Sequence, residues 1–155
     1  MKLKSNSIKY LRYDDDDFAY VRALRKAVFI DEQGAISNEE FDEYDRNARF
    51  ILILNANRPI ATARIADTPK GVKIGRIAVD KNERGNGYGA LIVKTAVEKA
   101  LECGASEVFV DAQNYAVPFY EKLGFKIVGN EIIDRGLVHT PMMILKGEFN
   151  ERKKK

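Results

Sequence analysis

The segment VDKNERGNGYGALIVK, residues 79–94, places three glycines and an arginine between two apolar stretches. Gly85, Gly87 and Gly89 lack a Cβ atom, so the chain here can adopt positive φ or approach a ligand closely. A helix that begins after them presents unpaired N–H groups and the positive end of its dipole. With Arg84 beside them, these groups could bind a pyrophosphate. The pattern favours a phosphate-binding loop, although a glycine-rich turn without a ligand has the same composition.

Two nucleotide-binding motifs overlap with these glycines. Gly85-x-Gly87-x-x-Ala90 matches the dinucleotide pattern, and Asp111 lies near the position of a ribose-binding acid. However, DKNER separates the expected strand end at Val79 from the first glycine, which in the dinucleotide motif forms the turn directly after the strand. The Walker motif is excluded because no Gly-Lys-Ser/Thr follows the glycines. A nucleotide-dependent oxidoreductase is therefore the minor alternative.

The strand, loop and helix expected over residues 74–100 resemble the cofactor motif of the GNAT superfamily of acyl-CoA-dependent N-acyltransferases. That motif is a strand followed by Arg/Gln-x-x-Gly-x-Gly/Ala and a helix. Arg84, Gly87 and Gly89 match its three defining positions. The resemblance implies that the phosphorylated cofactor is acetyl-CoA.

A second segment, AQNYAVPFYEKLGF at residues 112–125, resembles another GNAT motif, usually Asn-x-x-Ala-x-x-x-Tyr-x-x-x-Gly-Phe. Gln113 stands where asparagine is usual. The residues that match the motif are Ala116, Tyr120, Gly124 and Phe125. The segments VFIDEQG, EEFDEYD and GLVHTPMM further resemble the small ElaA/YjcF-like branch of the superfamily.

The resemblance implies a strand that splays from its neighbour and opens a slot for the pantetheine arm of the cofactor. Main-chain groups of the strand would bind that arm, residues 84–90 would hold the pyrophosphate, and the short helix Asn114–Leu123 would flank the thioester. The cofactor-binding residues expected on this basis are Ile77, Ala78, Val79, Arg84, Gly85, Asn86, Gly87, Tyr88, Gly89, Ala90, Gln113, Ala116, Phe119 and Tyr120.

Acyl transfer from a thioester to an amine needs a positioned amine, a donor for the developing oxyanion and a proton for the leaving sulfur. The resemblance places Tyr120 by the sulfur, where a phenol with a pKa of about 10 stays protonated at neutral pH. Packing under the sheet is the alternative role for this side chain. The main-chain amide of Val79 could polarise the carbonyl.

The general base has several candidates in the sequence, and a water relay could replace any of them. We select Glu43 and His139, together with Tyr120, as the expected catalytic residues. His139 could equally be a structural histidine near the start of a strand. The remaining candidates for the base are Asp45, Asp80 and Asp111.

The elements that must position these residues alternate along the chain in the order β-α-β-β-β-turn-α-β-α-β-β, which predicts a mixed α/β domain. Short turns join the three strands that precede the glycines, so these strands form an antiparallel meander. With the resemblance, this predicts a splayed mixed sheet with helices on both faces. The expected strands are 7–13, 50–55, 58–67, 72–80, 107–111, 125–129 and 139–147, and the expected helices are 18–29, 88–104 and 114–124.

Length and composition favour one domain over residues 1–150 with a disordered basic tail at 151–155. One cysteine, Cys103, excludes an internal disulfide and favours a reducing compartment, so we expect a cytoplasmic protein without a metal. No apolar run is long enough to span a bilayer. We expect no nucleic-acid or membrane partner, and a monomer or homodimer.

An acidic stretch, Asp31 to Asp45, contains seven carboxylates and no lysine or arginine. It is typical of a solvated loop, but it could also attract a cationic acceptor such as a polyamine or a lysine-rich segment. The leading hypothesis is an N-acetyltransferase that uses acetyl-CoA on a primary amine of a small molecule or peptide. The alternative is a non-catalytic acyl-CoA-binding module.

Overall fold

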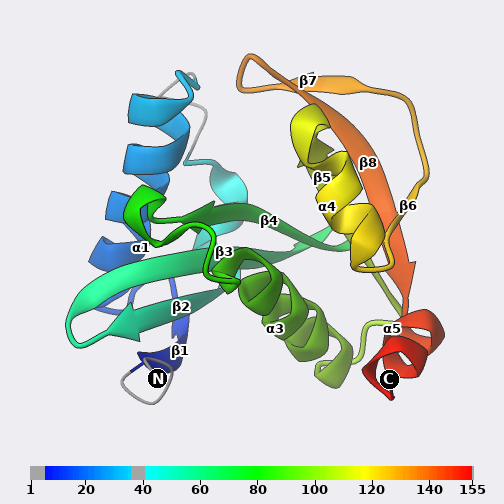
Figure 1. The fold of residues 1–155 in the computed structure, drawn as a ribbon, viewed down its shortest axis with the longest axis horizontal. Helices are drawn as coiled ribbons and strands as arrows, with labels where there is room; N and C mark the ends of the chain where they lie inside the picture. Colours follow the sequence, from blue (N-terminus) through cyan, green and yellow to red (C-terminus); the bar gives the residue numbers. More distant parts are fainter. Residues whose placement is uncertain (1–5, 36–40, 155) are drawn as a thin grey trace.

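The structure, a computed structural model, describes residues 6–35 and 41–154. Its centre is an eight-stranded mixed sheet of order β1-β2-β3-β4-β5-β8-β6, with β7 paired to β8 (Figure 1). The strands are β1 (Asn6–Arg12), β2 (Arg49–Asn55), β3 (Arg58–Thr68), β4 (Gly71–Val79), β5 (Glu107–Gln113), β6 (Lys126–Ile127), β7 (Ile132–Asp134) and β8 (Leu137–Leu145). The α-helices are α1 (Phe18–Arg25), α3 (Tyr88–Glu102), α4 (Val117–Lys122) and α5 (Lys146–Lys153).

Four short helical turns complete the described chain. A π-helical turn, η2 (Lys26–Glu32), directly continues α1. The other three are the 3₁₀ turns η3 (Glu43–Arg46), η4 (Lys81–Glu83) and η5 (Asn114–Ala116). None of the described helices is both long and apolar enough to cross a bilayer.

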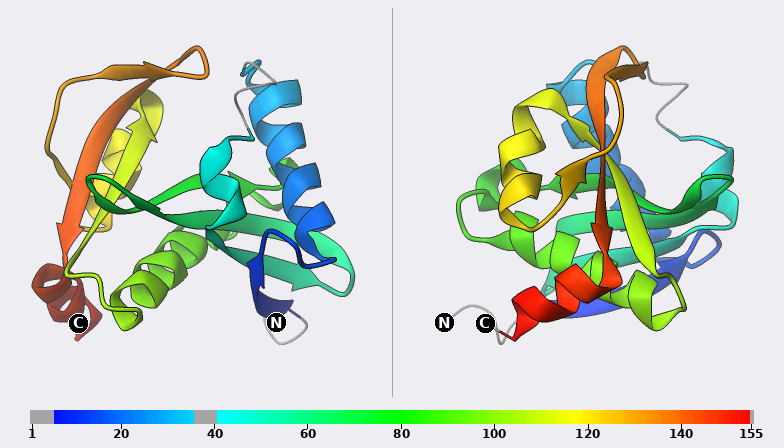
Figure 2. Two further views of the ribbon diagram at one scale, coloured as in Figure 1. Left: turned by 180° about the vertical axis from the view of Figure 1, so that it is seen from behind. Right: turned by 90° about the vertical axis from the view of Figure 1, so that its right-hand side faces the viewer.

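Strand β2 reads as a continuous apolar run because helices cover both faces of the sheet. Ile51 and Ile53 belong to the core that includes α3, whereas Phe50, Leu52 and Leu54 belong to the core that includes α1. Figure 2 shows the sheet between these helices from two further sides. The predicted mixed sheet with helices on both faces is confirmed.

Strands β4 and β5 are parallel and pair at only two positions, Lys73 with Phe109 and Ile74 with Val110. Beyond these pairs the strands diverge, so that β1–β4 and β5–β8 form the two arms of a V (Figure 1). The predicted splay is therefore present. We call the gap between the diverging ends of β4 and β5 the seam.

Two arginines adopt left-handed backbone conformations, one at a bulge in β4 and one in the turn between β7 and β8. The β3–β4 register shifts between Thr62 and Arg64, and Arg76 lies opposite this shift in a bulge with φ 48°. The pair Asp134–Leu137 closes a two-residue hairpin between β7 and β8. Its two turn residues, Arg135 and Gly136, have φ 56° and 79°. Strand β7 and this turn were not predicted from the sequence.

The charged end of the chain differs from the expected disordered tail. Helix α5 includes residues 151–153, which the sequence assigned to that tail. Phe149 anchors the helix in the core, and the main-chain amide of Leu145 is hydrogen-bonded to the Glu148 carboxylate at its start. Lys153 also pairs with Glu98 on α3. These contacts extend the helix into a sequence that looks solvated by composition alone.

Candidate active site

A cavity of about 770 Å³ lies at the seam between β4 and β5. Phe119 and Tyr120, which belong to or pack against the core of the α3 face, line it. Val28 and Phe29, from the core of the α1 face, line it as well. The cavity therefore reaches through the seam from one face of the sheet to the other.

The loop before α3 forms the part of the cavity that could hold phosphate. Gly85 and Gly87 have φ 83° and 86°, a conformation that side chains disfavour, and Gly87 is the residue that caps α3. Leu91 donates the first amide bond of the helix, to the Gly87 carbonyl. In the described chain no protein oxygen accepts from the amides of residues 88–90. These N–H groups at the positive end of a 15-residue helix suit a pyrophosphate.

One edge of β4 offers main-chain groups to the seam. The Asp80 amide donates to the Ile60 carbonyl on β3. Successive amides of a strand point to opposite edges, so the Val79 amide faces away from β3 and toward the seam. A ligand arm lying along this edge could thus bond to the strand as a neighbouring strand would. The loop amides and this strand edge fit the pyrophosphate and the pantetheine arm of an acyl-CoA.

Tyr120 lies on α4 at the edge of this cavity, 6% exposed. Its ring contacts Phe119 and Phe125 edge to face, with centroids 5.0 and 5.5 Å away. Its hydroxyl makes no hydrogen bond to any described residue. Burial raises the pKa of Tyr120 above its ordinary value, so the phenol stays protonated at neutral pH. A protonated phenol that lines this cavity is a candidate proton donor.

Residues 16–146 match the family described as the acetyltransferase (GNAT) domain. The chain belongs to the GNAT family. It is 34% identical over 121 residues to the uncharacterized N-acetyltransferase YjcF of Bacillus subtilis, covering 77% of this chain and 86% of that one. The crystal structure of Escherichia coli ElaA has a TM-score of 0.79 at 25% identity, covering 90% of this chain and 99% of ElaA. An acyl-CoA N-acyltransferase from Pseudomonas aeruginosa has the same fold, with a TM-score of 0.81 at 22% identity over 90% of this chain and 99% of that one.

These likenesses confirm the resemblance to the ElaA/YjcF-like branch of the GNAT superfamily. The protein is an N-acetyltransferase with acyl-CoA as its cosubstrate. The family favours an enzyme over the non-catalytic acyl-CoA-binding module. It does not specify the amine that receives the acetyl group.

Most residues predicted from the GNAT motifs come together at the cavity. Those that line it are Ile77, Val79, Arg84, Gly85, Gly87, Tyr88, Gly89, Ala90, Gln113, Ala116, Phe119, Tyr120 and His139. Two predicted cofactor residues do not. Ala78 is 1% exposed and packs in the core of the α1 face, because it points to the opposite side of β4 from Ile77 and Val79. Asn86 is exposed at the tip of the glycine loop, outside the cavity lining.

Glu43, predicted as a catalytic residue, is exposed on η3 and lies outside this cavity. It lines a separate, smaller cavity with Tyr44, Asn47 and Asp67. Glu43 was predicted as one of several possible bases, and residues 36–40 of the acidic stretch around it lie outside the described chain. The position of Glu43 does not support a role in the chemistry.

His139 lines the cavity but its ring nitrogens are both engaged. The Leu137 carbonyl can only accept, so the Nδ1 that lies 2.9 Å away carries the proton. Arg135 can only donate, so the Nε2 that lies 3.2 Å from its Nη2 accepts. Burial lowers the pKa of His139, and the charge of Arg135 lowers it further. The ring is a neutral acceptor that is held by an arginine.

The other candidates for the general base differ in whether they line the cavity. Asp45 is buried between Arg25 and Arg64, away from the cavity. Asp80 does not line the cavity and lies 3.7 Å from Arg58. Asp111 lines it and pairs with Lys73 at 2.7 Å, next to the last β4–β5 pair. Asp111 and His139 are therefore the candidates within reach of the cavity.

Glu32, the last residue of η2, and Gln33, which follows it, both line the cavity. Neither was predicted as a site residue. The carboxylate of Glu32 binds the Arg84 guanidinium at 2.6 and 2.8 Å, and Arg84 also donates to the Val79 carbonyl. Gln33 accepts from the Gln113 amide at 2.8 Å and donates to the Tyr115 hydroxyl at 3.2 Å. The side chain of Gln113 is thus engaged with protein. Arg84, expected to face phosphate, is held by a carboxylate.

We expect the substitution Glu32→Gln to tighten CoA binding by about two- to fivefold, because Glu32 competes with phosphate for Arg84. An exposed ion pair contributes up to about 1 kcal/mol, which sets this range. Isothermal titration calorimetry of CoA would measure it. The matched control is Glu43→Gln, which changes an exposed carboxylate outside the cavity and should alter neither CoA affinity nor turnover. Weaker CoA binding by Glu32→Gln would instead mean that Glu32 positions Arg84 for phosphate.

Proposed function

We propose that this acetyltransferase transfers an acetyl group from acetyl-CoA to a primary amine by direct attack of the amine on the thioester. The observation that carries the proposal is the open seam, which has unpaired amides at one end and the Tyr120 hydroxyl beside it. Acetyl-CoA supplies an acyl group that is already activated as a thioester. The protein therefore needs to bind the two substrates, orient them and transfer protons.

In this proposal the amides of residues 88–90 bind the pyrophosphate, and the main-chain amides of β4 at Ile77 and Val79 bind the pantetheine arm. The Val79 amide donates to the carbonyl oxygen as charge develops there. Tyr120 gives its proton to the sulfur as the carbon–sulfur bond breaks. The amine loses its proton to Asp111, to His139 after release from Arg135, or to water.

The ion pairs made by the acidic stretch, residues 31–45, weaken the case for a cationic acceptor. Glu32, Asp42 and Asp45 bind arginines of the protein itself. Much of the negative charge that suggested a cationic acceptor is therefore neutralised inside the fold. We also propose a cytoplasmic protein that is a monomer or homodimer and acts without nucleic acid or membrane.

A thiol-release assay with acetyl-CoA and a panel of primary amines tests the function. We expect acetyl-CoA-dependent release of CoA with at least one amine, and CoA binding by calorimetry. Acetylated product identified by mass spectrometry would establish that nitrogen is the acceptor. The outcome against the proposal is a folded protein that neither binds CoA nor releases thiol with any amine. Binding without turnover would revive the non-catalytic module.

A further inference from the structure

Glu32 holds the arginine that precedes the glycine loop. Its carboxylate oxygens lie 2.6 and 2.8 Å from Nη1 and Nη2 of Arg84. The same Nη2 also donates to the Val79 carbonyl at 3.0 Å. In a strand the N–H and C=O of one residue point to the same edge, so this nitrogen joins Glu32 to the edge of β4 that faces the seam. The carboxylate of Glu32 thus lies beside the residue whose amide the proposed transfer assigns to the thioester carbonyl.

The ion pair between Glu32 and Arg84 is one that a bound phosphate can break. The two side chains are 34% and 42% exposed, and exposed pairs contribute little free energy. A phosphate offers a guanidinium the same two-point geometry as a carboxylate does. Arg84 directly precedes the loop whose amides suit a pyrophosphate. In the complex with acyl-CoA, Arg84 would therefore bind phosphate, and Glu32 would lose its counter-ion.

The residues next to Glu32 would keep it at the cavity after Arg84 turns away. Gln33 accepts a hydrogen bond from the side-chain amide of Gln113 on the other arm, at 2.8 Å. Val28 and Phe29 are 5% and 4% exposed in the core of the α1 face. The helix η2 is a π-helix, in which an amide bonds to the carbonyl five residues earlier, as that of Gln33 does to Val28. Turns of this width bring Val28 and Phe29 into the cavity lining together with Glu32.

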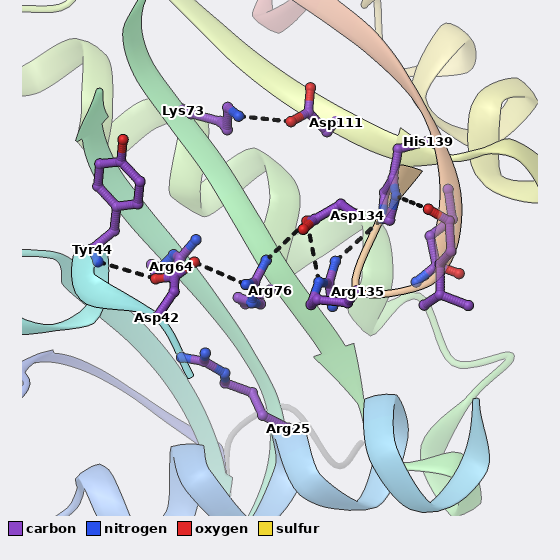
Figure 3. A network of polar contacts seen from close by, with 12 residues as sticks. Arg25, Asp42, Tyr44, Arg64, Lys73, Arg76, Asp111, Asp134, Arg135 and His139 are labelled. Atoms are coloured by element: carbon purple, nitrogen blue, oxygen red, sulfur yellow. Dashed lines mark hydrogen bonds and ion pairs between the residues drawn. The ribbon is translucent and has the colours of Figure 1, made fainter. Parts of the chain in front are cut away.

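The charged side chains at the other end of the cavity are paired with one another. Figure 3 shows Asp111 bound to Lys73, and beside this pair a chain of contacts that runs from Asp42 to His139. Positive and negative side chains alternate along that chain, from η3 through β4 to the β7–β8 turn. Among the described residues, the carboxylates in the cavity lining are Glu32 and Asp111. Of these two, Glu32 is the one held by the arginine of the cofactor motif.

We propose that Glu32, released when Arg84 binds the phosphate of acyl-CoA, receives the acceptor amine as an ammonium ion. The acceptor class is then a primary alkylamine, which at neutral pH is protonated as a lysine side chain is. The inference rests on the proposed acetyl transfer and adds the acceptor site to it. The bound ammonium ion gives one proton to solvent before the nitrogen attacks. As the carbon–nitrogen bond forms and the carbon–sulfur bond breaks, the nitrogen gives a second proton to an acceptor named for that transfer, and Tyr120 protonates the sulfur.

Isosteric amine pairs test this recognition in Glu32→Gln and in the unaltered protein. The pairs are phenethylamine against O-benzylhydroxylamine and propylamine against O-ethylhydroxylamine. At neutral pH the first member of each pair is an ammonium ion, whereas the second, an alkoxyamine, is uncharged. In Glu32→Gln we expect kcat/KM to fall about 10- to 100-fold for the ammonium member, mainly through KM, and to stay within about threefold for the alkoxyamine, as the loss of a charge-assisted hydrogen bond implies.

Glu43→Gln is the matched control for these kinetics, because Glu43 is an exposed carboxylate outside the cavity, and it should keep both values. Thermal melting reports whether each variant is folded. An equal fall for both members of a pair in a folded Glu32→Gln, or no fall for either, overturns the inference while the transferase function stands. Turnover of the alkoxyamines alone by the unaltered protein overturns it as well. Absence of thiol release with every amine counts against the function itself.

Calorimetry of CoA tests the release of Glu32 without relying on turnover. Coupling between two ligands is reciprocal, so an amine that binds better with CoA present also tightens CoA by the same factor. The probe is whichever of the two alkylamines has the higher kcat/KM. With this amine in excess, we expect the unaltered protein to bind CoA about two- to fivefold more tightly, a range set by the contribution of an exposed ion pair. The effect should persist in Glu43→Gln and vanish in Glu32→Gln. Unchanged CoA affinity in the unaltered protein would mean that Glu32 stays with Arg84, and overturns the proposal.

Discussion

Replacing Tyr120 with phenylalanine is expected to lower kcat on the order of 10²-fold, while CoA affinity stays within about twofold. The ring would keep its edge-to-face contacts with Phe119 and Phe125, so the packing of α4 is preserved. What is lost is the only polar atom of a side chain that lines the cavity, a hydroxyl that bonds to no described residue. Without this proton donor, the leaving thiolate would have to take its proton from water, which slows the reaction.

Steady-state kinetics and calorimetry of CoA on the same preparation separate the two effects. Tyr10→Phe is the matched control, since Tyr10 is 52% exposed on β1 and is not among the residues that line the cavity. Because burial raises the pKa of Tyr120, the unaltered enzyme should show no loss of rate from phenol ionisation below pH of about 10. Unchanged kcat in Tyr120→Phe would assign the residue to packing alone.

The substitution Asp45→Asn is expected to destabilise the fold by about 3–5 kcal/mol. Asp45 binds Arg25 at 2.8 and 3.2 Å and Arg64 at 3.0 Å, and Arg25 is 0% exposed. The neutral amide would remove the negative charge that the buried Arg25 and Arg64 guanidiniums both contact. For a chain of this size the melting temperature should fall by about 10 °C. Asp31→Asn is the matched control, because Asp31 is exposed and its pair with Lys26 should contribute less than about 1 kcal/mol.

The dependence of this effect on pH follows from the pKa of Asp45. Burial alone would raise that pKa, but hydrogen bonds and charge from Arg25 and Arg64 outweigh burial and lower it. The stabilisation is therefore complete above the unfolded pKa of about 4 and is lost as the pH falls through the lower folded value. Denaturation at several pH values should show the difference between the two proteins shrinking only below about pH 4. A constant difference down to pH 2 would contradict this assignment.

The cofactor half of the site was predictable because its signals are local. Glycines at 85 and 87 are needed where the backbone has positive φ, and the helix that follows is amphipathic with a clear start. Tyr120 was found because its motif places it on a short helix that ends at a glycine. The mixed α/β class followed from the order of the elements and the short turns between strands, whereas the splay and the helices on both faces were implied by the resemblance to the GNAT superfamily.

The arginines that line the other part of the cavity, Arg76 and Arg135, were not predictable because they meet only in the folded chain. Arg76 lies in an apolar strand, and nothing in the sequence marks the bulge that turns its backbone. Arg135 precedes Gly136 in a turn whose usual signal is Asn-Gly or Asp-Gly, so the hairpin was not expected. Glu43 was selected from several possible bases, whereas tertiary packing turns Asp42 and Asp45 toward the arginines and leaves Glu43 in solvent.

The hairpin that carries Arg135 and the glycine loop belong to different arms of the sheet. The hairpin is a two-residue turn between β7 and β8, whereas the loop follows β4 and leads into α3. Substitutions or insertions at the turn should therefore leave the backbone of the loop unchanged. Relatives that share this fold should accordingly vary more in sequence at the turn than in the loop.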